Sequence, residues 1–593
     1  MTDTIAQARA WRDQDPDDET RAELDRLIAD ADDDAEARAG TGAGTGTDAD
    51  TGADGDAAAA ARAALDDRFE ARLEFGTAGL RGALGAGPNR MNRVLVSQAA
   101  AGLAAFLLAR EPHPSVVIGY DGRKNSRVFA TDTAELMAGA GVRTILLPRL
   151  LPTPVLAFAV RHLSASAGVM VTASHNPAAD NGYKVYLGGG DGGSQIVPPA
   201  DGEIAAQIER VAAGDIRALP RAESYEVAGE DVLTAYIDTT AAIGHAAADV
   251  KFVYTAMHGV GWETAQRVFA AAGFSAPAPV TAQIEPDATF PTVAFPNPEE
   301  PGAMDLAFET AAAHDADVII ANDPDADRLA VGVPDANATT AGSHGWRRLS
   351  GNEVGWLLGW RAAERIAAAD PDGGSSGPSG PGIAGSTLAN SLVSSPALAE
   401  VARAYRLDHV ETLTGFKWIS RVPDLAFGYE EALGYLVDPD KIRDKDGISA
   451  AIELLALVSE LKAAGKTLAD HADDFAAKFG AFASSQISLR VSDLADIPKL
   501  MHRMRSNPPA RIGSVAVTSI DDFAEGFGKF PPNDILRIWT EDGSRVIVRP
   551  SGTEPKLKVY IDASSTEGDP RQRQVVADTK VAALDAGMRA LLA

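Results

Sequence analysis

Short apolar runs typical of β-strands alternate with alanine-rich helical runs over most of this chain. The first strand candidates are 115–119, 142–147 and 168–171, and a helix is expected from about Ser126. Further strand candidates are 251–255, 317–321 and 329–333, with a helix over 262–272. This alternation is typical of α/β units with mainly parallel sheets, in which ligands bind at the polar turns that follow the strands.

The C-terminal part of the chain has a different pattern. Two strand candidates, 545–548 and 557–561, flank an eight-residue loop, and a helix is expected from about 572 to 592. Neighbouring strands followed by one helix predict a smaller α+β domain at this end.

Length and charge limit the function classes that remain open. A chain of 593 residues is long enough for about four domains. Its formal net charge is −29, whereas nucleic acids and anionic membranes are bound by basic surfaces. We therefore expect no nucleic acid and no membrane as a partner, although a local basic pocket for a small phosphate remains compatible with this charge.

The chain contains no cysteine, which excludes disulfides, thiol catalysis and cysteine-ligated metal centres. No apolar run approaches the ~18 residues of a membrane span. The acidic start lacks the apolar core of a signal peptide. These features predict a cytoplasmic protein.

Two segments differ from the α/β pattern. Apolar residues within 10–30 recur at helical spacing, so this segment is a candidate to dock on the body of the protein. They are Trp11, Leu24, Leu27 and Ile28. Residues 39–60 contain no large apolar side chain and predict a disordered insert. Residues 371–382, rich in Gly, Ser and Pro, predict a flexible surface loop or a hinge.

Four polar loops carry residue types suited to chemistry. The first is TASHNP at 172–177, directly after the strand candidate GVMV. Pro177 disfavours a helical conformation at Asn176. Ser174 is thus expected on a turn at the end of a strand, with His175 beside it. An activated hydroxyl nucleophile fits this pattern, and so does an ordinary Asn-Pro turn with solvated polar residues.

The second loop, DPDADR at 323–328, follows the strand candidate DVIIA. Its carboxylates at Asp323, Asp325 and Asp327 repel one another unless a cation neutralises them, and oxygen ligands favour Mg²⁺, Mn²⁺ or Ca²⁺. Arg328 at the sixth position and Pro334 at the twelfth exclude an EF-hand. A solvated acidic turn is the alternative, although apolar strands on both sides argue against it.

The third loop is GYEEALGY at 428–435. It places Glu430 and Glu431 between glycines, and Lys441, Arg443 and Lys445 follow. These groups are suited to hydrogen-bond sugar hydroxyls, and an exposed helix start is the alternative.

The fourth loop is RPSGTEPK at 549–556, in which two hydroxyls and a glycine lie between Arg549 and Lys556. Backbone N–H groups with flanking cations fit a phosphate cradle. A plain hairpin turn is the alternative.

The four loops lie one in each domain-sized piece of the chain, so together they predict four domains facing one cleft. In their residues and in their order along the chain, the motifs resemble those of the α-D-phosphohexomutase family. They are FGTAGLRG (75–82), GVMVTASHNPAADNGYKVY (168–186), NDPDADR (322–328), TLTGFKW (412–418), GYEEALGY (428–435), KDGISAA (445–451) and RPSGTEPKLKVY (549–560). FGTAGLRG, TLTGFKW and NPEEPGAMD (297–305) are most similar to the phosphoglucomutase/phosphopentomutase branch.

The resemblance implies a phosphotransferase that interconverts glucose 1-phosphate and glucose 6-phosphate through a phosphoserine and a bisphosphate intermediate. Phosphopentomutase and phosphomannomutase are alternatives within the family, and a metal-dependent sugar phosphatase is a remote one. The implied catalytic residues are Ser174, His175, Lys445 and Arg81. The implied Mg²⁺ site is formed by Ser174, Asp323, Asp325 and Asp327. The implied substrate-binding residues are Arg328, Thr414, Gly415, Glu430, Glu431, Arg549, Ser551, Gly552, Thr553 and Lys556.

The resemblance also implies three similar mixed-sheet α/β domains plus a smaller C-terminal α+β domain around a central cleft. The expected segments are an N-terminal helical extension with the acidic insert (1–60), domain I with the phosphoserine loop (61–245), domain II with the metal loop (246–345), domain III with the sugar-binding loop (346–485) and domain IV with the phosphate-binding loop (486–593). A sugar phosphate is the expected small-molecule partner, a sugar 1,6-bisphosphate the expected activator, and a monomer or homodimer the expected assembly.

Two loops depart from other branches of the family. Pro324 and Ala326 stand at the second and fourth positions of the metal loop, where those branches have glycine, and Pro324 stiffens the loop but removes no carboxylate. Ala432 stands in the sugar loop where they have serine, so one hydroxyl contact to the sugar is missing. The second departure leaves pentose and mannose phosphates open as substrates.

Overall fold

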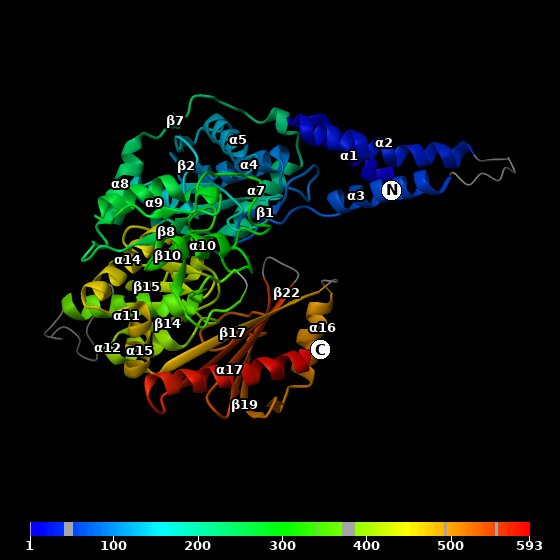
Figure 1. Cartoon of the computed structure of the whole chain (residues 1–593). Helices are drawn as coiled ribbons and strands as arrows, with labels where there is room; N and C mark the ends of the chain where they lie inside the picture. Colours follow the sequence, from blue (N-terminus) through cyan, green and yellow to red (C-terminus); the bar gives the residue numbers. More distant parts are fainter. Residues whose placement is uncertain are drawn as a thin grey trace.

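The structure of the chain is a computed structural model that describes residues 2–40, 51–340, 342–369, 386–491, 495–551 and 556–592. Four sheets organise the body of the protein, one in each of four domains. Figure 1 shows them in chain order, from domain I (blue and cyan) to domain IV (orange and red), with helices projecting from domain I at the N-terminus. Three mixed-sheet α/β domains and a C-terminal α+β domain are therefore confirmed. The segment 371–382 lies outside the described residues.

Three helices precede domain I: α1 (Thr2–Gln14), α2 (Asp18–Gly40) and α3 (Thr51–Phe69). The helical segment expected within 10–30 is divided between α1 and α2, because Pro16 lacks a backbone N–H and disfavours helix at the residue before it. Trp11, Leu24 and Ile28 are buried in one cluster with Val94 of domain I. The expected docking on the body of the protein is confirmed.

The predicted disorder of 39–60 is wrong for residues 51–60, which form the first half of α3. Alanine has the highest helix propensity, and Ala58, Ala61 and Leu65 of this helix are buried. Small side chains are thus enough to bury one face of α3, because this helix packs closely on α2. The helix also crosses the boundary predicted at residue 60, and residues 41–50 lie outside the described part of the chain.

Domain I has a seven-stranded sheet with the order β1-β5-β4-β2-β3-β7, and β6 pairs with β5. The strands are β1 (Leu80–Ala83), β2 (Ser115–Tyr120), β3 (Arg143–Leu146), β4 (Ala167–Val171), β5 (Asp180–Leu187), β6 (Ser194–Gln195) and β7 (Glu226–Val227). The helices are α4 (Arg93–Arg110), α5 (Ser126–Gly139), α6 (Thr153–His162), α7 (Ala200–Ala212) and α8 (Glu230–Ala241). Strands β4, β2, β3 and β7 are parallel, whereas β5 and β1 run antiparallel at one edge.

Helix α4 contradicts the expectation that no apolar run is long enough to span a membrane. Its 18 residues have a mean hydropathy of 1.3, and 67% of them are buried within the protein. The helix carries charges only at its two ends, Arg93 and Arg110, and packs against α5 and α7. We therefore interpret α4 as a core helix of domain I, whose burial explains its apolar composition.

Domains II and III repeat the mixed arrangement with fewer strands. Their sheet orders are β12-β11-β10-β8-β9 and β14-β13-β15-β16, each with a parallel centre and antiparallel strands at one edge. The elements of domain II are β8 (Phe252–Thr255), α9 (Gly261–Ala271), β9 (Ala278–Pro279), α10 (Asp305–His314), β10 (Val318–Ala321), β11 (Ala330–Pro334) and β12 (Trp346–Arg348). Those of domain III are α11 (Gly351–Ala369), β13 (Thr387–Ser391), α12 (Ala397–Tyr405), β14 (Asp408–Thr412), α13 (Phe416–Ile419), β15 (Leu425–Glu430), β16 (Gly434–Leu436), α14 (Gly447–Ala463) and α15 (Leu468–Phe479).

Domain IV is a six-stranded antiparallel sheet in the order β17-β22-β21-β20-β19-β18 with two helices. Its elements are β17 (Ala481–Arg490), α16 (Asp496–Ser506), β18 (Arg511–Ile512), β19 (Val515–Asp522), β20 (Leu536–Thr540), β21 (Arg545–Pro550), β22 (Lys556–Ser565) and α17 (Pro570–Leu592). Strands β21 and β22 are longer than expected, so the eight-residue loop between them shrinks to 551–555, of which 552–555 are not described.

The apolar cores show how the domains are joined. One cluster is continuous from domain I to domain III and includes Phe158, Phe252 and Phe427. Domain IV has a core of its own. A smaller apolar cluster joins it to domain III, with Leu392 and Leu413 packed among buried residues of domain IV. Arg545 adds polar contacts, because it donates to the Ser394 carbonyl and is paired with Glu411 at 3.2 Å. Domains I to III therefore form one body on which domain IV is docked.

Candidate active site

Ser174 lies in the turn after β4, in a conformation that the surrounding chain imposes. Its φ is 52°, in the left-handed region that non-glycine residues rarely adopt. The Ser174 N–H donates to Thr172 Oγ1 at 2.8 Å. The guanidinium of Arg123 donates to the Ser174 and Asn176 carbonyls, both at 2.6 Å. These bonds fix a buried serine whose Oγ is turned toward domain II.

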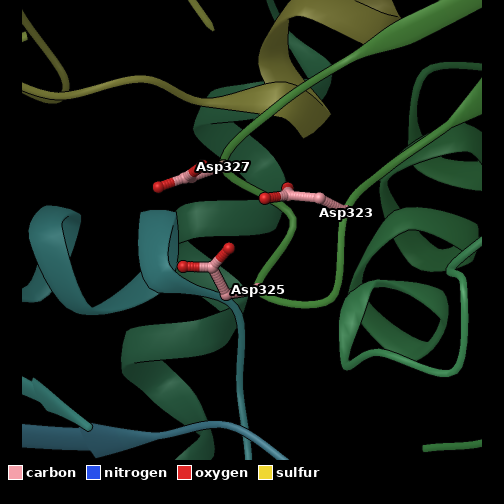
Figure 2. A group of neighbouring side chains, drawn as sticks. All are labelled: Asp323, Asp325 and Asp327. Carbon is pink, nitrogen blue, oxygen red and sulfur yellow. The ribbon is translucent and has the colours of Figure 1, made fainter. Parts of the chain in front are cut away.

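The Asp triad (Asp323, Asp325 and Asp327) follows β10 and lies against this serine. The three side chains are fully buried, and one oxygen from each lies within 4.8 Å of the others. Figure 2 shows the carboxylates directed toward a common point. Ser174 Oγ donates to Asp323 Oδ2 at 3.0 Å, which brings the predicted nucleophile and the predicted metal loop together.

The triad fits a hard divalent cation. Burial and the neighbouring charges of Asp325 and Asp327 raise the pKa of Asp323 well above its ordinary value. Within the described part of the chain, no hydrogen-bond donor reaches Asp325 Oδ1 or Asp327 Oδ1, although both atoms are buried. Orphaned carboxylate oxygens cost free energy unless something binds them, and an all-oxygen donor set favours Mg²⁺ or Mn²⁺.

Two lysines from different domains contact the triad. Lys184 of β5 donates from Nζ to Asp325 Oδ2 at 2.8 Å and to Asp327 Oδ2 at 2.9 Å. Lys445, just before α14 in domain III, lies 3.0 Å from Asp327 Oδ2 through its own Nζ. Although burial opposes ionisation, these two ammonium groups hold the pKa of Asp327 below its ordinary value. The site therefore combines negative oxygens with cations from domains I and III.

The remaining predicted residues of this cluster also face the triad. His175 Nδ1 lies 3.1 Å from Ser174 Oγ, and burial together with the charges of Arg328 and Arg81 lowers the pKa of this imidazole well below its ordinary value. Burial lowers the pKa of Arg81 on β1, and the nearby negative charge of Asp325 opposes this effect. Arg328 Nη1 donates to the Ala432 carbonyl at 3.0 Å and so links the metal loop to the sugar loop.

The sugar loop contains two glutamates that differ in role. Glu430 ends β15 and accepts a hydrogen bond from the Gly415 N–H at 2.6 Å, which joins it to the Thr414–Gly415 turn. Glu431 Oε2 accepts from Ser391 Oγ at 3.0 Å and Ser394 Oγ at 2.9 Å. Both glutamates are thus held by residues of domain III, and burial together with the Glu431 charge raises the pKa of Glu430. The alternative of an exposed helix start is wrong, because a strand ends here.

The predicted phosphate cradle lies apart from this cluster, on domain IV. Arg549 is at the end of β21 and Lys556 at the start of β22, and the Ser551 N–H closes the hairpin by donating to the Lys556 carbonyl at 2.8 Å. In the described part of the chain no hydrogen bond joins these residues to Ser174 or the Asp triad. Gly552 and Thr553 lie outside the described residues.

Three residues of the site were not among the sequence candidates. Lys184 stands within the motif DNGYKVY, and a lysine between Tyr183 and Val185 in a buried strand is a usable signal. Arg123 holds the serine turn through backbone carbonyls, and Thr153 contacts Asp325 across a domain boundary. Nothing in the sequence around Arg123 or Thr153 indicated these contacts, because they depend on how the domains pack.

Sequence models of one family match the chain in order. The phosphoglucomutase/phosphomannomutase alpha/beta/alpha domain I matches residues 72–214, domain II residues 234–336, domain III residues 352–479 and the C-terminal domain residues 487–579. The domain II match begins within α8, which the boundary predicted at residue 245 placed in domain I.

Known proteins are similar over nearly the whole chain. A Haemophilus influenzae protein described as a probable phosphomannomutase is 56% identical over 503 residues, covering 85% of this chain and 98% of that protein. A Mus musculus phosphopentomutase is 34% identical over 569 residues, covering 87% and 88% respectively. A Staphylococcus epidermidis phosphoglucomutase is 33% identical over 528 residues, covering 84% and 92%.

A solved structure shows the same fold. The phosphoglucomutase/phosphomannomutase family protein of Burkholderia thailandensis superposes with a TM-score of 0.63 at 19% identity, covering 87% of this chain and 98% of that one. The family assignment rests on two findings: the four domain models match in the same order, and the relatives are 33 to 56% identical. The chain belongs to the phosphoglucomutase/phosphomannomutase family of the α-D-phosphohexomutases, which are intramolecular phosphotransferases.

Proposed function

We propose that this protein is a Mg²⁺-dependent phosphoglucomutase that interconverts glucose 1-phosphate and glucose 6-phosphate. The observation that carries the proposal is the 3.0 Å contact between Ser174 Oγ and Asp323 Oδ2. It sets a buried hydroxyl nucleophile against a site suited to a divalent cation. Phosphoryl transfer depends on in-line positioning and charge neutralisation more than on covalent assistance, and this site supplies both.

The reaction follows from the positions of the side chains. Phosphorylated Ser174 donates its phosphoryl group to the free hydroxyl of the sugar phosphate: the Oγ–P bond breaks, and a P–O bond to the sugar forms. The sugar hydroxyl releases its proton as the new P–O bond forms, and the Ser174 oxygen gains one as it leaves. His175 Nδ1, 3.1 Å from Oγ, is placed to exchange the proton at that leaving oxygen. The resulting bisphosphate turns over and returns its other phosphate to Ser174. A free sugar 1,6-bisphosphate acts as activator because it re-forms phosphoserine.

Asp323, Asp325 and Asp327 would hold Mg²⁺ together with a phosphoserine oxygen. When bound, the ion neutralises charge on the transferring phosphoryl group. The protein itself adds positive charge through Lys184, Lys445 and Arg328. These cations attract the negatively charged phosphate of the substrate.

Binding at the other end of the sugar involves domains III and IV. Glu430, anchored by the Gly415 N–H, grips sugar hydroxyls. Arg549 and its hairpin hold the phosphate that is not reacting. Most of the domain IV core is separate, and only a smaller apolar cluster is shared with domain III, so domain IV can adjust over the substrate while domains I to III keep the transfer site fixed.

A second candidate, phosphopentomutase activity, is favoured by Ala432. This residue contributes its backbone carbonyl to Arg328 but offers no hydroxyl to a hexose. The mouse relative with 34% identity is a phosphopentomutase, and the protein with 56% identity is described as a probable phosphomannomutase. A site with one hydrogen bond fewer discriminates less strongly between sugars.

Steady-state kinetics on glucose 1-phosphate, ribose 1-phosphate and mannose 1-phosphate test this proposal. We expect the highest kcat/KM for glucose 1-phosphate, by about tenfold, or ~1.4 kcal/mol of transition-state stabilisation. Almost no inorganic phosphate should appear, because the mutase returns the phosphoryl group to sugar. A tenfold preference for ribose or mannose 1-phosphate would assign the chain to that activity, and stoichiometric phosphate release would indicate a phosphatase.

A further inference from the structure

Thr153 is a buried residue of domain I that grips the metal loop of domain II. It is the first residue of α6 and is fully buried. Its Oγ1 donates to Asp325 Oδ2 at 2.7 Å, and its backbone N–H donates to the Asp325 carbonyl at 2.9 Å. One residue thus holds both the main chain and the side chain of a central member of the Asp triad.

These contacts decide which oxygen of Asp325 faces the triad. Oδ2 is engaged twice, by Thr153 Oγ1 and by Lys184 Nζ at 2.8 Å. Oδ1 is buried and receives no hydrogen bond from the described residues. A carboxylate held through one oxygen cannot rotate freely, so its other oxygen keeps a fixed direction.

The backbone of the same loop is secured from its other side. The Val260 N–H donates to the Pro324 carbonyl at 2.8 Å, and a Cβ on Gly259 would come within 2.2 Å of Pro324 Cα. The loop is therefore clamped between domain II and α6. Of these contacts, the hydroxyl of Thr153 can be removed without altering the backbone.

We infer that Thr153 is a positioning residue for the divalent cation: its hydroxyl fixes the rotation of Asp325 so that Oδ1 is presented as a ligand. The inference rests on the proposed function, since it needs the Asp triad to bind a metal. It adds a contribution of domain I to the cation site beyond those of Ser174 and Lys184. Hydrogen-bond partners of metal ligands commonly contribute about 10- to 100-fold in metal affinity.

Binding of Mn²⁺, followed by electron paramagnetic resonance of the free ion, tests this inference. Thr153→Val keeps the shape and the backbone N–H but loses the hydroxyl, and its dissociation constant for Mn²⁺ should rise at least about tenfold. Thr153→Ser retains the hydroxyl and should remain within about threefold of wild type. Thr133→Val is the matched control, because Thr133 is also buried in domain I but donates to the Phe129 carbonyl.

The outcomes separate the inference from the proposed function. If the wild type binds Mn²⁺ and Thr153→Val binds it equally well, the inference is wrong while the metal site stands. If the wild type binds no Mn²⁺, the proposed metal site fails and the inference falls with it. If Thr133→Val weakened Mn²⁺ binding as much as Thr153→Val does, the effect would reflect the stability of domain I, and the positioning role of Thr153 would be wrong. Thr153→Ala, which also lacks the hydroxyl, repeats the comparison if circular dichroism shows that Thr153→Val does not fold.

Discussion

Replacing Ser174 with alanine should lower kcat by at least about four orders of magnitude, because it removes the hydroxyl that lies against Asp323 and is proposed to carry the phosphoryl group. The fold should persist, since the turn is held by backbone contacts: Arg123 donates to the Ser174 carbonyl, and the Ser174 N–H donates to Thr172. A coupled assay of glucose 6-phosphate formation gives the rate, and circular dichroism verifies the fold.

Ser97→Ala is the matched control for this variant. Ser97 is likewise a buried serine of domain I, on α4, and its Oγ has no hydrogen-bond partner among the described residues. Its replacement should leave kcat within about twofold, because no bond is lost. Substantial turnover in Ser174→Ala would exclude a covalent route through this serine.

Removing divalent cations should have the second-largest effect. EDTA should lower kcat at least about a thousandfold, as expected when several kcal/mol of transition-state stabilisation are lost, and added Mg²⁺ should restore it. Asp327→Asn should produce a loss of similar size that Mg²⁺ does not repair, because Asp327 Oδ1 is one of the two orphaned oxygens directed to the triad.

Asp315→Asn controls for charge removal in the same domain. Asp315 is exposed at the end of α10 and pairs only with Lys251, at 3.2 Å, among the described residues. Its variant should keep wild-type turnover and the same Mg²⁺ requirement. Full activity of metal-free wild type would show that the Asp triad serves another purpose.

The central pair of the site could be predicted because it depends on local sequence. Ser174 and Asp323 each follow a buried strand, β4 or β10, that lies in the parallel part of its sheet. Carboxyl ends of parallel strands are where ligands gather in α/β folds. A polar motif directly after such a strand therefore indicates the site without knowledge of the packing.

Other parts of the site could not be predicted because they depend on contacts between domains. Thr153 of domain I lies 172 positions from Asp325 of domain II, and its sequence surroundings are compatible with an ordinary core role. For Lys445 the sequence implies a catalytic role but not its contact with Asp327. The separation of domain IV from the transfer cluster likewise results from how that domain docks on domain III.

The errors in the fold have a common physical origin. Alanine-rich stretches carry little periodic signal, so the sequence predicts disorder for 51–60, where a helix forms. Helix α4 is uncharged between its two terminal arginines because it is buried on several sides, and composition alone does not separate such a helix from a membrane span. In both cases tertiary packing, rather than local pattern, decided the structure.

The mass of the peptide that contains Ser174, measured in the active enzyme, tests the central claim most directly. The account predicts a gain of about 80 Da, one phosphoryl group, located on Ser174 by fragmentation. It also predicts that this mass disappears when the enzyme transfers the group to excess sugar phosphate. An enzyme that turns over with Ser174 unmodified throughout, or with the phosphoryl group on another residue, would contradict it.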